Sequence, residues 1–189
     1  MNKHLLSFLT LALCFGLPTT PLWAQAPEPD TVILSDTLDY DDIKRLSTFT
    51  GNVILTRGNL NLKADRIVVN ETADGTQHAV ATVSSSPLVL ARQESPEKFE
   101  IIKGEGDRAE YNSATEQLTL IGHAVITRYV CGKAIDSISG ERVVYNKKAD
   151  TYQAVSSSTA GAGQNRVRSV ARPRAHIERA IAECQQKSH

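Results

Sequence analysis

The sequence predicts an all-β protein, and two alternating motifs carry this prediction. The first runs small residue, acid, Arg or Thr, apolar residue, any residue, Tyr or Val, and Asn or Asp; its copies are residues 35–41, 64–70, 106–112 and 140–146. Its apolar residue and its Tyr or Val stand two positions apart, as residues on one face of a strand do. The closing Asn or Asp favours a turn. Four copies therefore predict four similar strands.

The second motif begins with Gly and ends with Thr-Arg; its copies are residues 51–57 and 122–128, with a looser version at 87–92. The same 71 positions separate Asp36 from Asp107 and Gly51 from Gly122. One half of the domain thus repeats the other, and internal repetition outranks local propensity as a guide to architecture.

The first residues predict a signal peptide. Lys3 and His4 precede an apolar stretch, 5–17, that is shorter than the roughly 20 residues needed to span a bilayer. Cleavage after Ala24 or Ala26 would remove it. We expect residues 1–24 to be the signal peptide and the Pro-rich residues 25–30 to be an irregular leader.

The main domain is expected at residues 31–155, where short apolar runs alternate with turn formers. The runs are 53–55, 60–62, 67–69, 88–90, 101–102, 118–120, 125–126 and 143–145. Residues 156–165 are rich in Ser and Gly and predict a linker. The basic tail, 166–189, predicts a last edge strand at 166–171 and a short helix at 173–186 that begins at its proline.

Composition excludes several functions. The formal net charge of zero argues against bulk attraction to nucleic acid, and no catalytic or phosphate-binding motif is present. No metal-ligand spacing appears either.

Cys131 and Cys184 would remain in the mature protein after the signal peptide is cleaved, and either a disulfide or two free thiols fits the sequence. The tail arginines suit a solvated end, or a contact with phosphate groups or an acidic partner.

The acids of the first motif invite a comparison with the paired carboxylates of a glycosidase; they are Asp36, Asp65, Asp107 and Glu141. Catalytic carboxylates are distinguished by unlike surroundings. These four occupy the same place in four copies, so we expect a repeated structural role.

Strand parity predicts one aliphatic inner face. When the copies of the second motif are superposed, Val53 and Leu55 align with Leu88 and Leu90 and with Ala124 and Ile126. The apolar residues of the first motif also stand two positions apart, so both motifs place apolar side chains on one face. A self-filled core and a lipid-accommodating groove both fit this pattern.

Both motifs, taken in order over about residues 31–155, resemble the OstA-like family. The residues that carry the resemblance are Ser35-Asp36, the phrase 49–53 with 63–65, the Tyr111 strand, and the phrase 120–124 with Gly140-Glu141. The resemblance implies a twisted antiparallel β-jellyroll, open at both ends, without catalysis or cofactor. It also implies a periplasmic bridge that carries lipopolysaccharide from the inner to the outer membrane.

The partners implied are lipopolysaccharide through its lipid A, LptC, the N-terminal domain of LptD, and further copies in a head-to-tail homo-oligomer. Within the family pattern, Tyr111, Leu90 and Ile33 match lipid-facing positions. Together with the parity, the expected lipid-binding residues are Ile33, Leu38, Tyr40, Val53, Leu55, Ile67, Leu88, Leu90, Tyr111, Ile126 and Tyr145. Two alternatives are an LptC-like jellyroll anchored by an uncleaved N-terminus and a carbohydrate-binding β-solenoid.

Overall fold

The computed structural model describes residues 29–84, 87–157 and 166–187. The predicted signal peptide, most of the leader and nearly all of the linker lie outside the described residues. The described chain forms β1 (Thr31–Leu34), β2 (Thr37–Asp41), β3 (Leu46–Arg57), β4 (Leu60–Glu71), β5 (Gln77–Thr82), β6 (Val89–Ser95), η1 (Pro96–Lys98), β7 (Glu100–Gly106), β8 (Arg108–Asn112), β9 (Gln117–Val130), β10 (Lys133–Asn146), β11 (Thr151–Val155), β12 (Arg168–Val170) and α1 (Arg174–Lys187).

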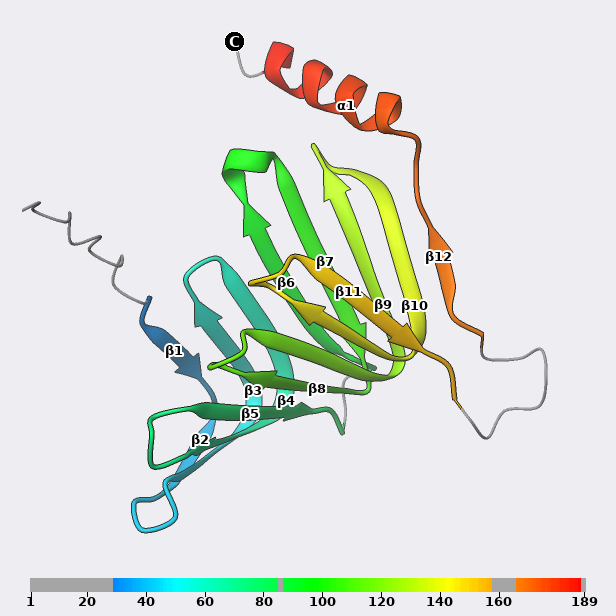
Figure 1. The fold of residues 1–189 in the computed structure, drawn as a ribbon. Helices are drawn as coiled ribbons and strands as arrows, with labels where there is room; N and C mark the ends of the chain where they lie inside the picture. Colours follow the sequence, from blue (N-terminus) through cyan, green and yellow to red (C-terminus); the bar gives the residue numbers. More distant parts are fainter. Residues whose placement is uncertain (1–28, 85–86, 158–165, 188–189) are drawn as a thin grey trace, which may run out of the picture.

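The strands form an antiparallel jellyroll of two layers joined by long strands (Figure 1). Layer A has the order β1-β3-β4-β6-β7-β9-β10-β12. Layer B has the order β2-β3-β4-β5-β8-β9-β10-β11. The long strands β3, β4, β9 and β10 pass from one layer into the other. The all-β prediction is confirmed, with α1 as the one α-helix among the described residues.

Two equivalent corners explain the 71-residue repeat. In β3, Gly51 and Asn52 adopt left-handed φ angles of 83° and 47°, and in β9, Gly122 and His123 adopt 71° and 48°. A pair of such residues makes a bulge that bends a strand. The ladder between β3 and β4 skips between Thr50 and Val53, so the bend marks the point where β3 crosses between the layers.

The acids of the first motif hold these corners. The Asp36 N–H donates to the Gly51 carbonyl at 3.0 Å, and the Asn52 side chain donates to the Asp36 carboxylate at 3.0 Å. Asp107 bonds the Gly122 carbonyl at 2.9 Å in the same way, and its carboxylate lies 3.0 Å from His123 Nδ1.

Asp65 serves a third corner, where its carboxylate accepts from the Ser84 N–H at 2.6 Å. A structural role, as predicted from the repetition, therefore applies to three of the four acids. Glu141 is exposed in β10 beside the register shift at Gly140.

The core lies between the layers, close to the corners. Its fully buried large side chains come from both layers; they are Ile67, Leu120, Val53, Val89 and Val143. Because register places opposed residues on the same face, one row runs Phe49, Ile67, Ala81, Ala109, Leu120 and Val143 across layer B. These side chains stabilise the fold by removing apolar surface from water.

The basic tail returns to the body of the domain. β12 pairs with β10 in layer A, where Ser169 lies opposite Ile138. α1 lies beyond the ends of β9 and β10, at the top of Figure 1. Cys184 of α1 is joined to Cys131 by a disulfide, with the Cα atoms 5.8 Å apart. Among the described residues, no helix has the length and apolar character that crossing a membrane requires.

Candidate lipid-binding groove

Two adjoining cavities lie between the layers. The first has a volume of about 190 Å³ and is lined mainly by apolar side chains, including Ile33, Leu55 and Val69. The second, of about 130 Å³, lies toward the opening between the layers. Both contact Arg57, Leu60, Tyr111 and Leu118, so the two form one continuous groove.

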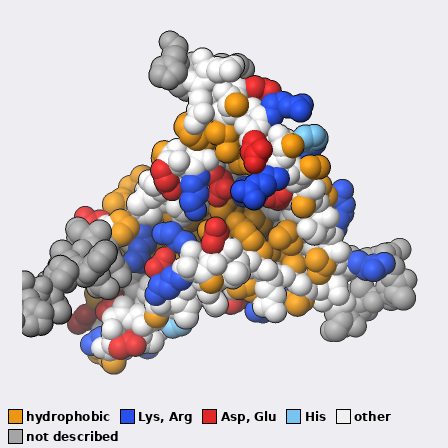
Figure 2. Space-filling view, turned by 45° about the horizontal axis from the view of Figure 1, so that its top comes forward, with side chains coloured by type: hydrophobic (Ala, Val, Ile, Leu, Met, Phe, Trp, Pro, Cys, Tyr) orange, Lys and Arg blue, Asp and Glu red, His pale blue; other side chains and the backbone are white. Residues whose placement is uncertain are grey.

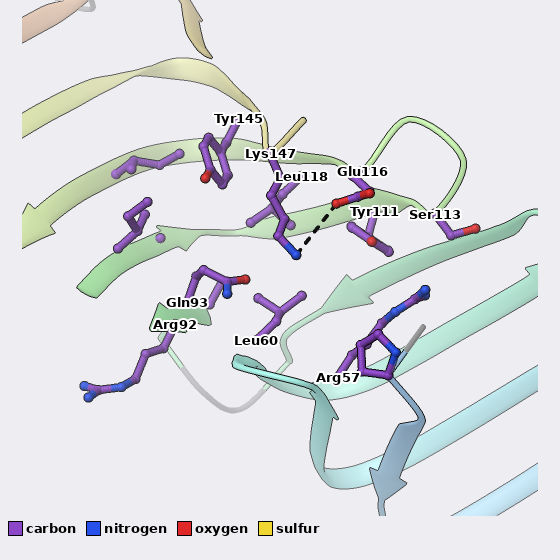
Figure 3. A pocket seen from close by; sticks show the side chains of 15 residues that line it. Arg57, Leu60, Arg92, Gln93, Tyr111, Ser113, Glu116, Leu118, Tyr145 and Lys147 are labelled. Carbon is purple, nitrogen blue, oxygen red and sulfur yellow. Dashed lines mark ion pairs between the residues drawn. The ribbon is translucent and has the colours of Figure 1, made fainter. Parts of the chain in front are cut away.

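The groove has an apolar floor and a polar rim. Figure 3 shows Leu60 from β4 facing Tyr111 and Leu118 from β8 and β9, with Lys147 and Glu116 beside the opening. The Lys147 ammonium lies 3.7 Å from the Glu116 carboxylate. Figure 2 shows the same character on the surface, where apolar side chains occupy a hollow framed by charged ones. An amphiphile would find apolar surface inside and charged groups at the mouth.

The two ends of the groove differ. At the end formed by β1 and β2, register places Leu38 opposite Phe49 and Tyr40 opposite Ser47, both on the inner face. Leu38 is nevertheless 56% exposed and Tyr40 63% exposed. They stay exposed because β2 is the edge strand of layer B at this end, and nothing in the described chain covers the inner face of β2.

At the other end, two half-buried aromatic side chains of neighbouring strands in layer B pack against each other. The Tyr145 and Tyr152 rings stack with centroids 4.8 Å apart. Burial, followed by the carboxylates of Asp150, Glu100 and Glu116, raises the pKa of Tyr145 to about 12. Burial also raises the pKa of Tyr152. Glu100 belongs to layer A, so a carboxylate of one layer contributes to the raised pKa of a tyrosine in the other.

A cluster of ion pairs braces layer A at this end. Arg128 donates to Asp136 through Nε at 2.8 Å and to Glu100 through Nη1 at 3.2 Å. Its side chain is 31% exposed and that of Glu100 only 12%. Burial opposes the charge of Arg128, but the two carboxylates outweigh it and raise the guanidinium pKa. A charge this well paired is retained in a partly buried site.

Most of the expected lipid-binding residues lie at the groove. The cavities are lined by Ile33, Leu55, Ile67, Tyr111, Ile126 and Tyr145. Val53 lies deeper, 1% exposed in the core beside the corner. Leu38 and Tyr40 extend the inner face at the open end, as described above.

The inner-face placement of Leu88 and Leu90 is wrong. Leu90 points outward and is 45% exposed, whereas Val89 and Ala91 are buried at 0% and 5%. Leu88 precedes β6 and is half-buried. The looser copy of the motif, 87–92, is one residue shorter than 51–57, and its inward frame starts at its third residue, Val89, as that of 51–57 starts at Val53.

Sequence reasoning also missed inner residues that lack a motif of their own. Leu60, Leu62 and Leu118 line the cavities, and Gly104 lets Leu120 approach, because a Cβ there would lie 2.8 Å from Leu120 Cδ1. The alternation of apolar and polar residues through 60–64 could have identified Leu60 and Leu62 as inner-face residues. Within the described ranges, no cluster of His, Cys, Asp and Glu has the makings of a metal site.

Comparison with known proteins identifies the family. The model of the family described as LptA/(LptD N-terminal domain) LPS transport protein matches residues 32–151. The lipopolysaccharide export system protein LptA of Haemophilus influenzae is 28% identical over 142 residues, covering 75% of this chain and 76% of that protein. LptA of Escherichia coli K12 is 27% identical over 151 residues, covering 78% and 77%.

A solved structure shows the same fold. LptH of Pseudomonas aeruginosa, an LptA homologue described as a periplasmic component of the lipopolysaccharide transport device, superposes with a TM-score of 0.65 at 19% identity. The match covers 77% of this chain and 96% of LptH. With more than half of its length matched by the family model, the chain belongs to the LptA/(LptD N-terminal domain) family of lipopolysaccharide transport proteins.

Proposed function

We propose that this protein binds lipopolysaccharide with the acyl chains of lipid A in the groove and conducts it through the periplasm from the inner to the outer membrane. The observation that carries the proposal is the apolar inner face, which runs from the exposed Leu38 through Leu55 to Tyr111. Each methylene removed from water is worth about 0.8 kcal/mol. A groove that covers several chains therefore lowers the barrier to crossing an aqueous compartment.

The lipid-facing set that we propose follows from the cavities. It comprises Ile33, Leu55, Leu60, Leu62, Ile67, Tyr111, Leu118, Ile126 and Tyr145, with Leu38 and Tyr40 at the open end. Saccharide and phosphate groups would remain at the polar rim. The protein acts without catalysis in this proposal, because the repeated acids already serve the corners.

Topology supports a bridge built from successive jellyrolls. Each layer contains eight strands whose neighbours are all antiparallel, so its first and last strands run in opposite directions. The first strand of a second copy, placed in the same orientation, would then extend the last strand in antiparallel fashion. Unpaired edges add strands readily. Head-to-tail copies, LptC and the LptD N-terminal domain are the partners that we propose.

A photoreactive amino acid at Tyr111 tests the lipid-binding proposal. In cells, irradiation should join Tyr111 to lipopolysaccharide, because its side chain lines both cavities. The same group at Leu90, which points outward from β6, is the matched control and should give little adduct. Adducts at Leu90 equal to those at Tyr111, or no adduct at Tyr111, Leu55 and Ile33 alike, would contradict the proposal.

A further inference from the structure

A third cavity lies between α1 and the start of β10. Its volume is about 440 Å³, and it shares no lining residue with the two cavities of the groove. One wall is formed by Lys133, Ala134 and Ile135 of β10, and the other by Arg172 and α1. Figure 1 shows α1 beyond the ends of β9 and β10, apart from the space between the layers. This cavity is therefore separate from the lipid-binding groove.

The helical period explains why α1 presents polar side chains to this cavity. One side of α1 is buried or half-buried and carries the disulfide; its residues are Ile177, Ala180, Ile181 and Cys184. His176, Arg179 and Glu183 fall on the adjacent side, because residues three and four apart share a helix face, and they line the cavity. The apolar side and the disulfide hold the helix, and they leave its polar side turned toward β10.

Positive charge dominates the cavity. Lys133, Arg172 and Arg179 are cationic at neutral pH, and Glu183 is the one carboxylate among the described residues that line it. Three cations against one carboxylate leave a surplus of two positive charges, before any contribution from His176. Because Lys133 pairs with Glu183, the surplus resides on the two arginines.

The acids nearest to the cavity are engaged elsewhere. Glu178, on α1, lies 3.4 Å from the Arg174 guanidinium. The Asp136 carboxylate accepts from Arg128 Nε at 2.8 Å and from the backbone N–H of Arg172 at 3.3 Å. Neither carboxylate lines the cavity, so an anion from outside the chain would meet uncompensated positive charge.

The two surplus arginines are carried by fixed parts of the chain. The Arg172 guanidinium donates through Nε to the Ala134 carbonyl at 3.2 Å, which holds it against β10. Within the described residues, Arg179 makes no ion pair and no side-chain hydrogen bond, but the disulfide fixes the helix that carries it. Guanidinium groups match the oxygens of a phosphate, and a fixed site loses less conformational freedom on binding.

We infer that this cavity binds a phosphate group carried by a saccharide or by a lipid headgroup, with Arg179 and Arg172 as the donors and Lys133 beside them. A phosphate monoester carries up to two negative charges at neutral pH, which balances the surplus in the cavity. The inference goes beyond the proposed function, since the groove takes the apolar part of a ligand and this cavity takes an anion.

Nuclear magnetic resonance on the purified mature protein tests the inference. His176 lines the cavity, so its imidazole signals report an anion that enters. Inorganic phosphate should shift these signals saturably in the wild type. Arg179→Gln should weaken this binding roughly tenfold, because it removes a charge-assisted hydrogen bond. Arg179 is exposed, so urea unfolding of the variant should match the wild type.

Arg174→Gln is the matched control. It removes the same charge from the same helix, but Arg174 pairs with Glu178 and lies outside the cavity. Phosphate binding should therefore change less than about twofold.

Two further probes distinguish the sources of the phosphate group. Glucose 1-phosphate that binds at least as tightly as inorganic phosphate assigns the cavity to a phosphate on a saccharide. Cosedimentation with phosphatidylglycerol vesicles that Arg179→Gln abolishes assigns it to a lipid headgroup.

Three results would overturn the inference, and each would leave lipid capture at Tyr111 untouched. The first is no shift of the His176 signals at about 20 mM phosphate, a concentration that fills a millimolar site. The second is an equal loss of binding in Arg179→Gln and Arg174→Gln, which would reduce the effect to net charge. The third is binding of inorganic phosphate while both further probes fail, which would limit the cavity to free phosphate.

Discussion

The two ends of the jellyroll are built from the same motifs but stabilised by different means. At the β1–β2 end, apolar inner side chains such as Leu38 remain exposed, and the edge is acidic. At the β11–β12 end, the Tyr145 and Tyr152 rings stack on each other, Arg128 braces layer A, and a disulfide fixes the tail. The difference teaches that the same motifs can leave one end with exposed apolar surface while contacts outside the motif pattern hold the other end in place.

Both halves of the domain contain an equivalent corner, and substitutions at the corner glycines should cause the largest loss of stability. A Cβ at Gly51 would lie 2.2 Å from Asp36 Oδ2, and one at Gly122 would lie 2.2 Å from Asp107 Oδ2. Both residues also have left-handed φ angles. Gly51→Ala and Gly122→Ala should each lower the free energy of unfolding by about 3 kcal/mol or more.

Urea unfolding measures this effect, and Gly132→Ala is its control. Gly132 has a φ of 76° but no neighbour within 4 Å of an added Cβ, so only backbone strain of about 1 kcal/mol is expected. Equal losses at Gly51 and Gly122 would show that the corners are equivalent. A loss at either position no greater than at Gly132 would refute the role of the aspartates.

Removal of the disulfide should lower the local stability of one end only. Replacing Cys131 and Cys184 by Ser removes a cross-link with a sequence separation of 53 residues, which is worth about 4 kcal/mol to the segment it closes. Amide hydrogen exchange should accelerate in α1 and β12 but not in β1. Ala180, 2% exposed, should become accessible. Unchanged exchange in α1 would show that packing alone holds the tail.

The tyrosines should have a smaller effect on stability, one that depends on pH. The Tyr145 pKa is raised to about 12 in the folded protein, against about 10 in the unfolded chain. A raised folded pKa favours the native state fully below about pH 10, and this contribution is lost as the pH rises through the folded value. Stability should therefore decline between pH 10 and 12.

Absorbance at 295 nm follows the ionisation, and Tyr145→Phe should remove one late-titrating group. At the opposite end, the pKa of Tyr40 is raised chiefly by its hydrogen bond to the Asp42 carboxylate, although its ring is exposed. Asp42→Asn should therefore lower the Tyr40 pKa and leave Tyr145 unchanged. A Tyr145 that ionised near pH 10 would mean that the β11 end is open to water.

Sequence patterns predicted the fold well because its determinants are local and repeated. The motif acids and the Gly-Asn and Gly-His pairs mark the corners, and alternation marks the strands between them. The inner face was predicted less completely. The frame at Leu90 failed because the looser motif, 87–92, is one residue shorter than 51–57, and the exposure of Leu38 depends on where the layer ends. The Tyr145–Tyr152 stack and the Arg128 cluster were not predicted, since they depend on strand register: Tyr145 lies opposite Tyr152 in the β10–β11 pair, and Arg128 joins Asp136 of the next strand to Glu100 of β7.

The central claim is that lipid acyl chains occupy the space between the layers, and β1 offers the most direct test. Ile33 faces the larger cavity, whereas its neighbour Val32 points outward and is 54% exposed. Lipopolysaccharide binding to purified Ile33→Asp and Val32→Asp variants should be compared by titration. We predict that Ile33→Asp weakens binding at least about tenfold, because a carboxylate is costly to bury among acyl chains. Val32→Asp should change it less than about twofold. Equal effects of the two substitutions, or none from Ile33→Asp, would contradict the account.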